Sequence, residues 1–263
     1  MITIRAFGAA LAVSALLACS GSVAMAAESF SFSNGAPGQP GYLGPCHTAS
    51  VVVTVDAAVV PPPFVALAVG NRALAVLASL DCPTGIDGAA PQPARAAELN
   101  VFILPPDGTL GLHQYQASLI GTDAAMQSRL QDLGMGAMAE TVSPLTFTRT
   151  PGLLTRVTSS VPWSAGAFTL DAHVSQPLSL PLPQLAATTW HKGKRGIIRM
   201  RFTNDRVAAG AGVGSLAVQP SSQLAQWLGG SAISGAAAML VADVAARIDL
   251  CGAAIADCPN GDS

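Results

Sequence analysis

The sequence predicts a mainly β fold of the antiparallel β-sandwich type, built as one large domain or two lobes with one or two short helices. Many short apolar or alternating segments are separated by turns rich in glycine and proline, which is typical of all-β domains. The chain has 263 residues, of which 50% are hydrophobic and 11% are charged. This length can bury a sizeable core, and this composition excludes a solvated disordered chain.

Residues 1–26 have the features of a secretory signal peptide. Arg5 provides the positive end, an apolar run follows, and residues 24–26 form a small-x-small cleavage site. A second interpretation stays open, because residues 16–19 resemble a lipobox in which Cys19 would become a lipid-anchored N-terminus. Under either interpretation the chain is exported, to the periplasm, the cell surface or the exterior. We expect no transmembrane span, since this apolar run and every later one are too short.

An N-terminal β lobe is predicted for residues 27–121. Its strands are β-branched or apolar segments that end at proline or glycine turns. The turns at residues 70–71 and 105–108 are short enough to predict hairpins. His113 and Tyr115 share one face of the last strand, where we expect the ordinary polar side of a strand rather than a ligand site. The predicted strands are residues 51–60, 64–69, 72–80, 99–104 and 109–119.

A helical insert or linker at residues 122–140 separates this lobe from a C-terminal β lobe at residues 141–263. Within the insert, Thr122 or Asp123 can cap a helix over residues 124–133, and a glycine follows to end it. This non-β segment is the most natural boundary between two halves of the chain.

Alternating segments again predict strands in the C-terminal lobe. Residues 210–214 hold three glycines and predict a flexible turn, while residues 223–228 predict a short helical turn. Residues 232–250 fit both the helical and the strand period, and the β-rich context favours a strand over residues 239–250. The predicted strands are residues 145–150, 153–161, 167–175, 196–203, 215–218 and 239–250.

Four cysteines besides Cys19 predict two disulfides, because an even number of cysteines in an exported chain is typical of a disulfide framework. Three pairings are possible. We favour Cys46 with Cys82, which brackets the first strands, and Cys251 with Cys258, which closes a small terminal loop. A metal site is disfavoured, since the spacings are not CxxC and no histidine lies near the second pair.

A cluster of cations lies between residues 190 and 206 of a chain whose formal net charge is -2. Ile198 and Met200 alternate there with arginines, which predicts a strand with a basic outer face. Such a face can bind an anionic glycan or a lipid headgroup. The simpler interpretation is that the cations only keep an exposed strand soluble, and the overall charge does not indicate nucleic-acid binding. The candidate anion-binding residues are Lys192, Lys194, Arg195, Arg199 and Arg201.

Sequence motifs of catalysis and cofactor binding are missing. No serine has glycine two residues before and two residues after it, and the chain contains no HExxH and no P-loop. Asp171 and His173 are predicted on the outward face of a strand, where a serine nearby in space would complete an acyl-transfer triad. Because such polar pairs are common on exposed strands, we expect no catalytic residue, no metal and no cofactor.

Three functional hypotheses follow from these observations. The leading hypothesis is an exported bacterial β-rich envelope or extracellular binding or structural protein, with an anion-binding face around residues 192–206. A second is a secreted hydrolase that uses Asp171 and His173. A third is a self-assembling surface subunit, a homo-oligomer whose low charge leaves large apolar contact patches.

Overall fold

The computed structural model describes residues 28–31, 43–82, 94–122, 142–149, 154–175, 185–194, 196–252 and 255–258, together with residues 128, 131–132, 134 and 138–139. The predicted signal peptide at residues 1–26 and most of the helix predicted at residues 124–133 lie outside this part. None of the helices in the described part is long and apolar enough to cross a membrane.

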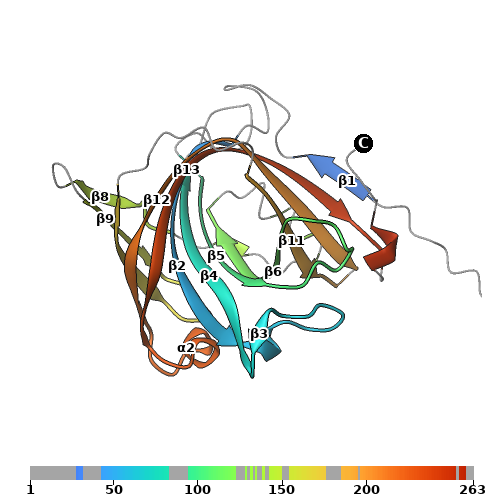
Figure 1. The fold of residues 1–263 in the computed structure, drawn as a ribbon, viewed down its shortest axis with the longest axis horizontal. Coiled ribbons are helices and arrows are strands. Elements are labelled where there is room, and N and C mark those ends of the chain that lie inside the picture. The colour runs from blue at the N-terminus through green and yellow to red at the C-terminus, as the bar shows by residue number, and fades with distance from the viewer. Residues whose placement is uncertain are drawn as a thin grey trace, which may run out of the picture.

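Within the described residues, thirteen strands belong to one sheet, so the predicted mainly β class is confirmed (Figure 1). The strands are β1 (Glu28–Ser31), β2 (Leu43–Asp56), β3 (Ala68–Val69), β4 (Arg72–Cys82), β5 (Ala94–Phe102), β6 (Leu112–Gly121), β7 (Met138–Ala139), β8 (Thr146–Arg149), β9 (Leu154–Val161), β10 (Phe168–Ser175), β11 (Leu185–Lys192), β12 (Ile197–Val218) and β13 (Ala232–Leu250). The helices are η1 (Ala57–Val59), α2 (Gln223–Leu228) and η2 (Ile255–Asp257).

Seven strands close into a ring in the order β12, β13, β2, β4, β5, β6, β11 and back to β12. All neighbours in this ring are antiparallel except β6 and β11, which are parallel. Strands from both sides of residues 122–140 share the ring, since β13 pairs with β2 and β11 pairs with β6. The proposed division into two lobes stays a prediction.

A second layer, β8 to β10, packs on the outside of this ring. β10 pairs with the C-terminal half of β12, and Figure 1 shows β8 and β9 on the side of β2 and β4 that faces away from β6 and β11. The hydroxyls of Ser79 on β4 and Ser159 on β9 lie 2.8 Å apart in the contact between the layers. Val51, Leu77 and Leu99 share this outer face of the ring by register and are fully buried. The opposite face of these strands therefore points into the ring.

β12 extends through the glycines of residues 210–214, so the flexible turn predicted there is wrong. A Cβ on Gly210 or Gly212 would collide with the carbonyl oxygen of Ser175 or His173 on the neighbouring strand, and one on Gly214 would press on a side chain of β2. Glycine in a strand allows such close approach of two backbones. These glycines therefore mark the crowded crossing of β10, β12 and β2.

Residues 232–250, which fit both the helical and the strand period, form a strand. β13 runs over Ala232–Leu250 and pairs with β12 along its length and with β2 along part of it. Such pairing on both edges satisfies the backbone, so the alanine-rich helical period does not prevail. The predicted helical turn at residues 223–228 is confirmed as α2, where Ser222 caps the N-terminus and Gly229 ends the helix with φ 77°.

Both predicted disulfides are present. Cys46 and Cys82 join β2 to its ring neighbour β4, and Cys251 and Cys258 close a loop after β13. Backbone hydrogen bonds in both directions between Ile197 and residues 251–252 attach the second loop to the start of β12. The disulfides therefore stabilise two different parts of the same ring.

Candidate functional site

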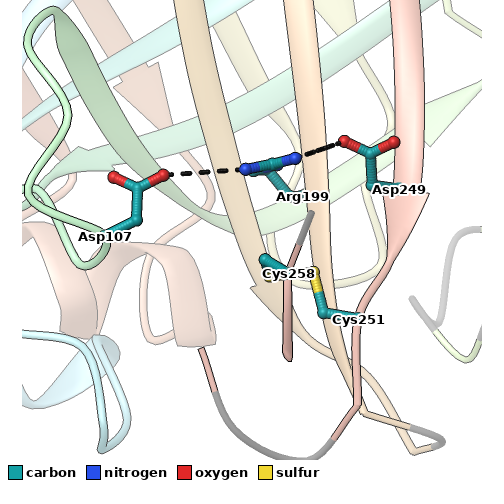
Figure 2. Close-up of a disulfide and its surroundings, with 5 residues drawn as sticks. All are labelled: Asp107, Arg199, Asp249, Cys251 and Cys258. Atoms are coloured by element: carbon teal, nitrogen blue, oxygen red, sulfur yellow. Dashed lines mark hydrogen bonds and ion pairs between the residues drawn. A yellow bond between two sulfur atoms is a disulfide. The ribbon is translucent and has the colours of Figure 1, made fainter. Parts of the chain in front are cut away.

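The basic segment at residues 190–206 is the first candidate site. The structure corrects the prediction for one face of its strand. Ile198 and Met200 are buried on one face of β12, but Arg199 on the other face is only 1% exposed. Nε and Nη2 of Arg199 donate to Oδ2 of Asp249 at 3.1 and 2.8 Å, and Nη1 lies 3.7 Å from Oδ2 of Asp107 (Figure 2). The prediction of an outward-facing Arg199 is wrong, because the turn carrying Asp107 and the C-terminal loop cover this face.

The other described cations of the segment differ from Arg199 in exposure. Lys192 and Lys194 are exposed and Arg201 is half-buried. Nζ of Lys192 donates to the carbonyl oxygen of Pro62 at 2.9 Å. Arg195 lies outside the described residues. Anion binding by these side chains stays a prediction that this geometry does not test.

Asp171 and His173 lie on the outward face of β10, as predicted. Arg156 on β9 donates to both carboxylate oxygens of Asp171, at 2.9 and 2.6 Å, while Nε2 of His173 lies 3.8 Å from Oδ1. The hydrogen bonds from Arg156 hold the pKa of Asp171 below its ordinary value, although partial burial works against them. Asp171 is thus engaged by a cation rather than by the histidine that a triad would require.

His113 and Tyr115 are buried rather than on a polar strand face. The indole Nε1 of Trp190 donates to Nδ1 of His113 at 3.0 Å. Because this indole can only donate, the His113 proton resides on Nε2, which donates to the Thr109 hydroxyl at 3.3 Å. That hydroxyl donates to Asp107 at 2.7 Å. Burial lowers the pKa of His113 despite the charge of Asp107, which keeps the imidazole neutral.

Asp107 connects this chain of hydrogen bonds to Arg199. Burial opposes its charged form, but hydrogen bonds from the hydroxyl and the backbone N–H of Thr109 hold the pKa of Asp107 below its ordinary value. The Arg199 guanidinium also lies 5.9 Å from the ring centre of Trp190. Because these groups satisfy one another, we interpret the network as an anchor for the turn at residues 105–108.

The inner face of the ring carries a different polar group. Glu98 and Asn100 are two residues apart on β5 and share one face, and a bulge sets Gln116 of β6 opposite Asn100. Nε2 of Gln116 donates to Oε2 of Glu98 at 3.2 Å, and Asn100 also hydrogen-bonds to this carboxyl. We call Glu98, Asn100 and Gln116 the Glu98 cluster.

The Glu98 carboxyl is desolvated although the residue keeps some accessible surface. Burial raises the pKa of Glu98, and the hydrogen bonds from Asn100 and Gln116 only partly offset it. A carboxyl in this state can hold a proton at a pH where an exposed glutamate has lost it. Such a group is suited to general acid–base chemistry.

Two oxygen atoms of the Glu98 cluster lack a hydrogen-bond partner among the described residues: Oδ1 of Asn100 and Oε1 of Gln116. Both residues are at least 95% buried. Because a buried carbonyl oxygen without a partner is costly, these atoms suit a ligand that offers O–H or N–H groups. The cluster thus combines two acceptors with one carboxyl that can donate or accept.

The side chains that register places beside the Glu98 cluster are uncharged, and burial lowers the pKa of His191, whose Nδ1 lies 2.8 Å from the backbone oxygen of Gln116. Pairing places Gln114, Thr189 and Met200 on the same inner face, and all three are buried. Arg72 shares this face at the end of β4, but its guanidinium donates to the carbonyls of Thr54, Trp227 and Leu228. In the described part of the chain, no group of three or more histidine, cysteine or acidic side chains could hold a metal ion.

Sequence reasoning missed the Glu98 cluster, although one signal was available. Glu98 is an acidic residue inside an apolar strand, and Asn100 follows at strand spacing. Gln114 and Gln116 show the same spacing on the next strand of the same hairpin. Two polar pairs on facing strands of one hairpin predict a polar patch on one sheet face, but the closure of the ring around that face depends on β11 to β13.

Comparison with known proteins shows the fold. No protein-family model and no curated protein sequence matches the chain. An acetoacetate decarboxylase-like enzyme from Sphingomonas wittichii RW1 is similar in structure, with a TM-score of 0.51 and 11% identity over 82% of this chain and 91% of that one. This similarity shows the fold. The enduracididine biosynthesis enzyme MppR with bound HEPES buffer (TM-score 0.46, 16% identity, 82% and 88% covered) and acetoacetate decarboxylase from Legionella pneumophila (0.46, 11%, 80% and 86%) are more weakly similar.

This fold overturns the three functional hypotheses drawn from the sequence. The envelope hypothesis rested on the export signal, the many short strands, the two predicted disulfides and the lack of a catalytic motif. The hydrolase hypothesis rested on Asp171 and His173, and the surface-subunit hypothesis on the low charge and apolar composition. The chain instead has the fold of an acetoacetate decarboxylase-like enzyme. The hydrolase hypothesis also loses its geometry, since Arg156 occupies both carboxylate oxygens of Asp171.

Proposed function

We propose that this chain is an enzyme that binds a small uncharged molecule inside the ring and uses Glu98 as its proton donor and acceptor. The observation that carries this proposal is the Glu98 cluster, in which a desolvated carboxyl lies beside two buried carbonyl oxygens without partners. A ligand with a carbonyl oxygen and a hydroxyl or amide N–H would complement all three groups. The similarity of the fold to that of an acetoacetate decarboxylase-like enzyme also supports an enzymatic role.

The chemistry proposed here differs from Schiff-base catalysis. That route needs a lysine whose pKa is lowered by an apolar pocket or by a neighbouring cation. The chain has two lysines, Lys192 and Lys194, and both are exposed. An anionic oxo acid would place its carboxylate beside the Glu98 carboxyl, while Arg72 lies six residues along β4 from the partner of Glu98 and is already engaged by three carbonyl groups. A neutral carbonyl compound therefore fits the Glu98 cluster better.

The protonation of Glu98 can be measured directly, because the chain has only three glutamates. In protein labelled with 13C at the glutamate carboxyl, we expect one resonance, absent from Glu98→Gln, to titrate above the ordinary range of glutamate. The unfolded chain releases this proton at lower pH than the folded one, so folded wild type loses stability as pH rises between the two pKa values. In urea unfolding, the free energy of unfolding of Glu98→Gln relative to that of wild type should therefore be higher at pH 8 than at pH 4.

The catalytic role is tested by deuterium incorporation next to the carbonyl of a neutral hydroxyketone such as hydroxyacetone, followed by NMR. General acid–base catalysis typically contributes 10²- to 10⁴-fold, so we expect Glu98→Gln to slow the exchange by about that factor. Asp171→Asn removes an exposed carboxylate from β10 and is the matched control, which should leave the rate unchanged. Equal exchange in wild type and Glu98→Gln, or an ordinary Glu98 pKa, would overturn the proposal.

A further inference from the structure

An exposed apolar surface adjoins the Glu98 cluster. Leu67, Leu74 and Leu104 are 44%, 45% and 49% exposed, although large aliphatic side chains are usually buried. Backbone hydrogen bonds join their segments, from Leu74 to Leu67, from Leu67 to Phe102 and from Leu104 to Val65. We call Leu67, Leu74, Phe102 and Leu104 the apolar shelf.

Register places the apolar shelf on the same face as the Glu98 cluster. Val76 of β4 pairs with Asn100 of β5, and Leu74 precedes Val76 by two residues and so shares its face. Phe102 lies two residues beyond Asn100 on β5 and is half-buried. The inner face thus changes from exposed leucines at one end to the buried polar atoms of Asn100 and Gln116 further in.

The length of this face sets the kind of ligand that can use it. At a rise of about 3.3 Å per residue, Glu98 and Phe102 are roughly 13 Å apart along β5. A molecule that reaches from the apolar shelf to the Glu98 cluster must therefore be elongated. Its inner end needs hydrogen-bonding groups, and its outer end needs apolar surface to cover the leucines.

We propose that the ligand of this site is amphipathic, with a neutral polar head at the Glu98 cluster and an aliphatic tail along the apolar shelf. This inference rests on the proposed function and adds the substrate class to it. Continuity of the two surfaces on one sheet face is the reason to assign the shelf to the ligand rather than to a second copy of the chain. A primary carboxamide head matches the cluster, because its two N–H groups face two acceptors and its carbonyl faces the Glu98 carboxyl.

The inference is tested with a series of straight-chain primary amides, butanamide, hexanamide and octanamide, by isothermal titration calorimetry at pH 6. Each methylene that the shelf covers should tighten the dissociation constant about four-fold. The double substitution Leu67→Asn with Leu74→Asn should flatten this dependence on chain length. Val213→Asn is the matched control, since Val213 is 67% exposed on β12, and it should keep the wild-type dependence.

The two proposals fail in different ways in this experiment. Glu98→Gln should weaken the binding of every amide by a similar factor and preserve the dependence of affinity on chain length. A wild-type affinity that does not change with length, or no binding at any length, overturns the amphipathic ligand, while the Glu98 titration judges the acid–base role separately. If the shelf substitutions change the mass in sedimentation and not the length dependence, the shelf contacts a second copy and the inference is wrong. Thermal unfolding checks that the exposed substitutions leave the protein folded.

Discussion

Arg199 is a buried cation held between two carboxylates, Asp249 on the neighbouring strand and Asp107 on a turn (Figure 2). Transfer of such charges from water is expensive, so each depends on the others for compensation. The alternation around Arg199 was readable from the sequence, but the cover over its face was not. That cover comes from a turn about 90 residues earlier and from a loop after β13, and no local period encodes either contact.

Replacing Arg199 by methionine should destabilise the protein strongly. The substitution keeps much of the side-chain volume but removes the guanidinium that pairs with the fully buried Asp249. Breaking a buried pair in this way typically costs about 3–5 kcal/mol. Urea unfolding at pH 7 measures the loss, and Arg156→Met, which breaks an exposed pair with Asp171, is the matched control and should cost far less. Similar losses in the two variants would contradict the interpretation of Arg199 as a structural anchor.

β12 shows why composition alone can predict the wrong element. Three glycines within five residues usually indicate a turn, and here they form the middle of a strand of 22 residues. The reason is tertiary, because β10 and β2 approach so closely that side chains do not fit at Gly212 and Gly214. The short hairpins, by contrast, were predictable, since their turns and alternation lie within one segment of sequence.

Alanine at Gly212 tests this packing. Its Cβ would collide with the carbonyl oxygen of His173, so β10 must shift away from β12. Overpacking of this kind typically costs about 1–3 kcal/mol, and we expect a loss in this range in urea unfolding. Gly230→Ala is the control, because the nearest atom to its new Cβ would be the end of the Ile233 side chain at 3.7 Å. If Gly212→Ala is as stable as Gly230→Ala, the close approach of the strands does not matter for stability.

The whole molecule is organised by the closure of one sheet around the Glu98 cluster. Closure requires β12 to pair with β13, β11 and β10 along different parts of its length. A sequence of short strands predicts the β class but not which strands meet, since the choice is made between segments far apart in the chain. The Glu98 cluster is a consequence of that choice, because its inner face exists only when the ring is closed.

The two disulfides should contribute unequally to the free energy of unfolding of the whole chain. In the chain-entropy model, a disulfide stabilises by restricting the unfolded chain, and the effect grows with the loop it closes. The sequence separation is 36 for Cys46 and Cys82 but 7 for Cys251 and Cys258. The model then assigns about 4 kcal/mol to the first bond and about 2.5 kcal/mol to the second.

We therefore expect the double serine variant at residues 46 and 82 to lose more free energy of unfolding than the one at residues 251 and 258. Serine replaces both partners in each variant, so neither leaves a reactive thiol, and each variant is the control for the other. Urea unfolding of both variants beside wild type, under non-reducing conditions, gives the two losses. The loop after β13 also hydrogen-bonds to β12 through Ile197. If the 251 and 258 variant loses more, native contacts of that loop with β12 outweigh chain entropy, and the ring depends on its C-terminal edge more than on the bond between β2 and β4.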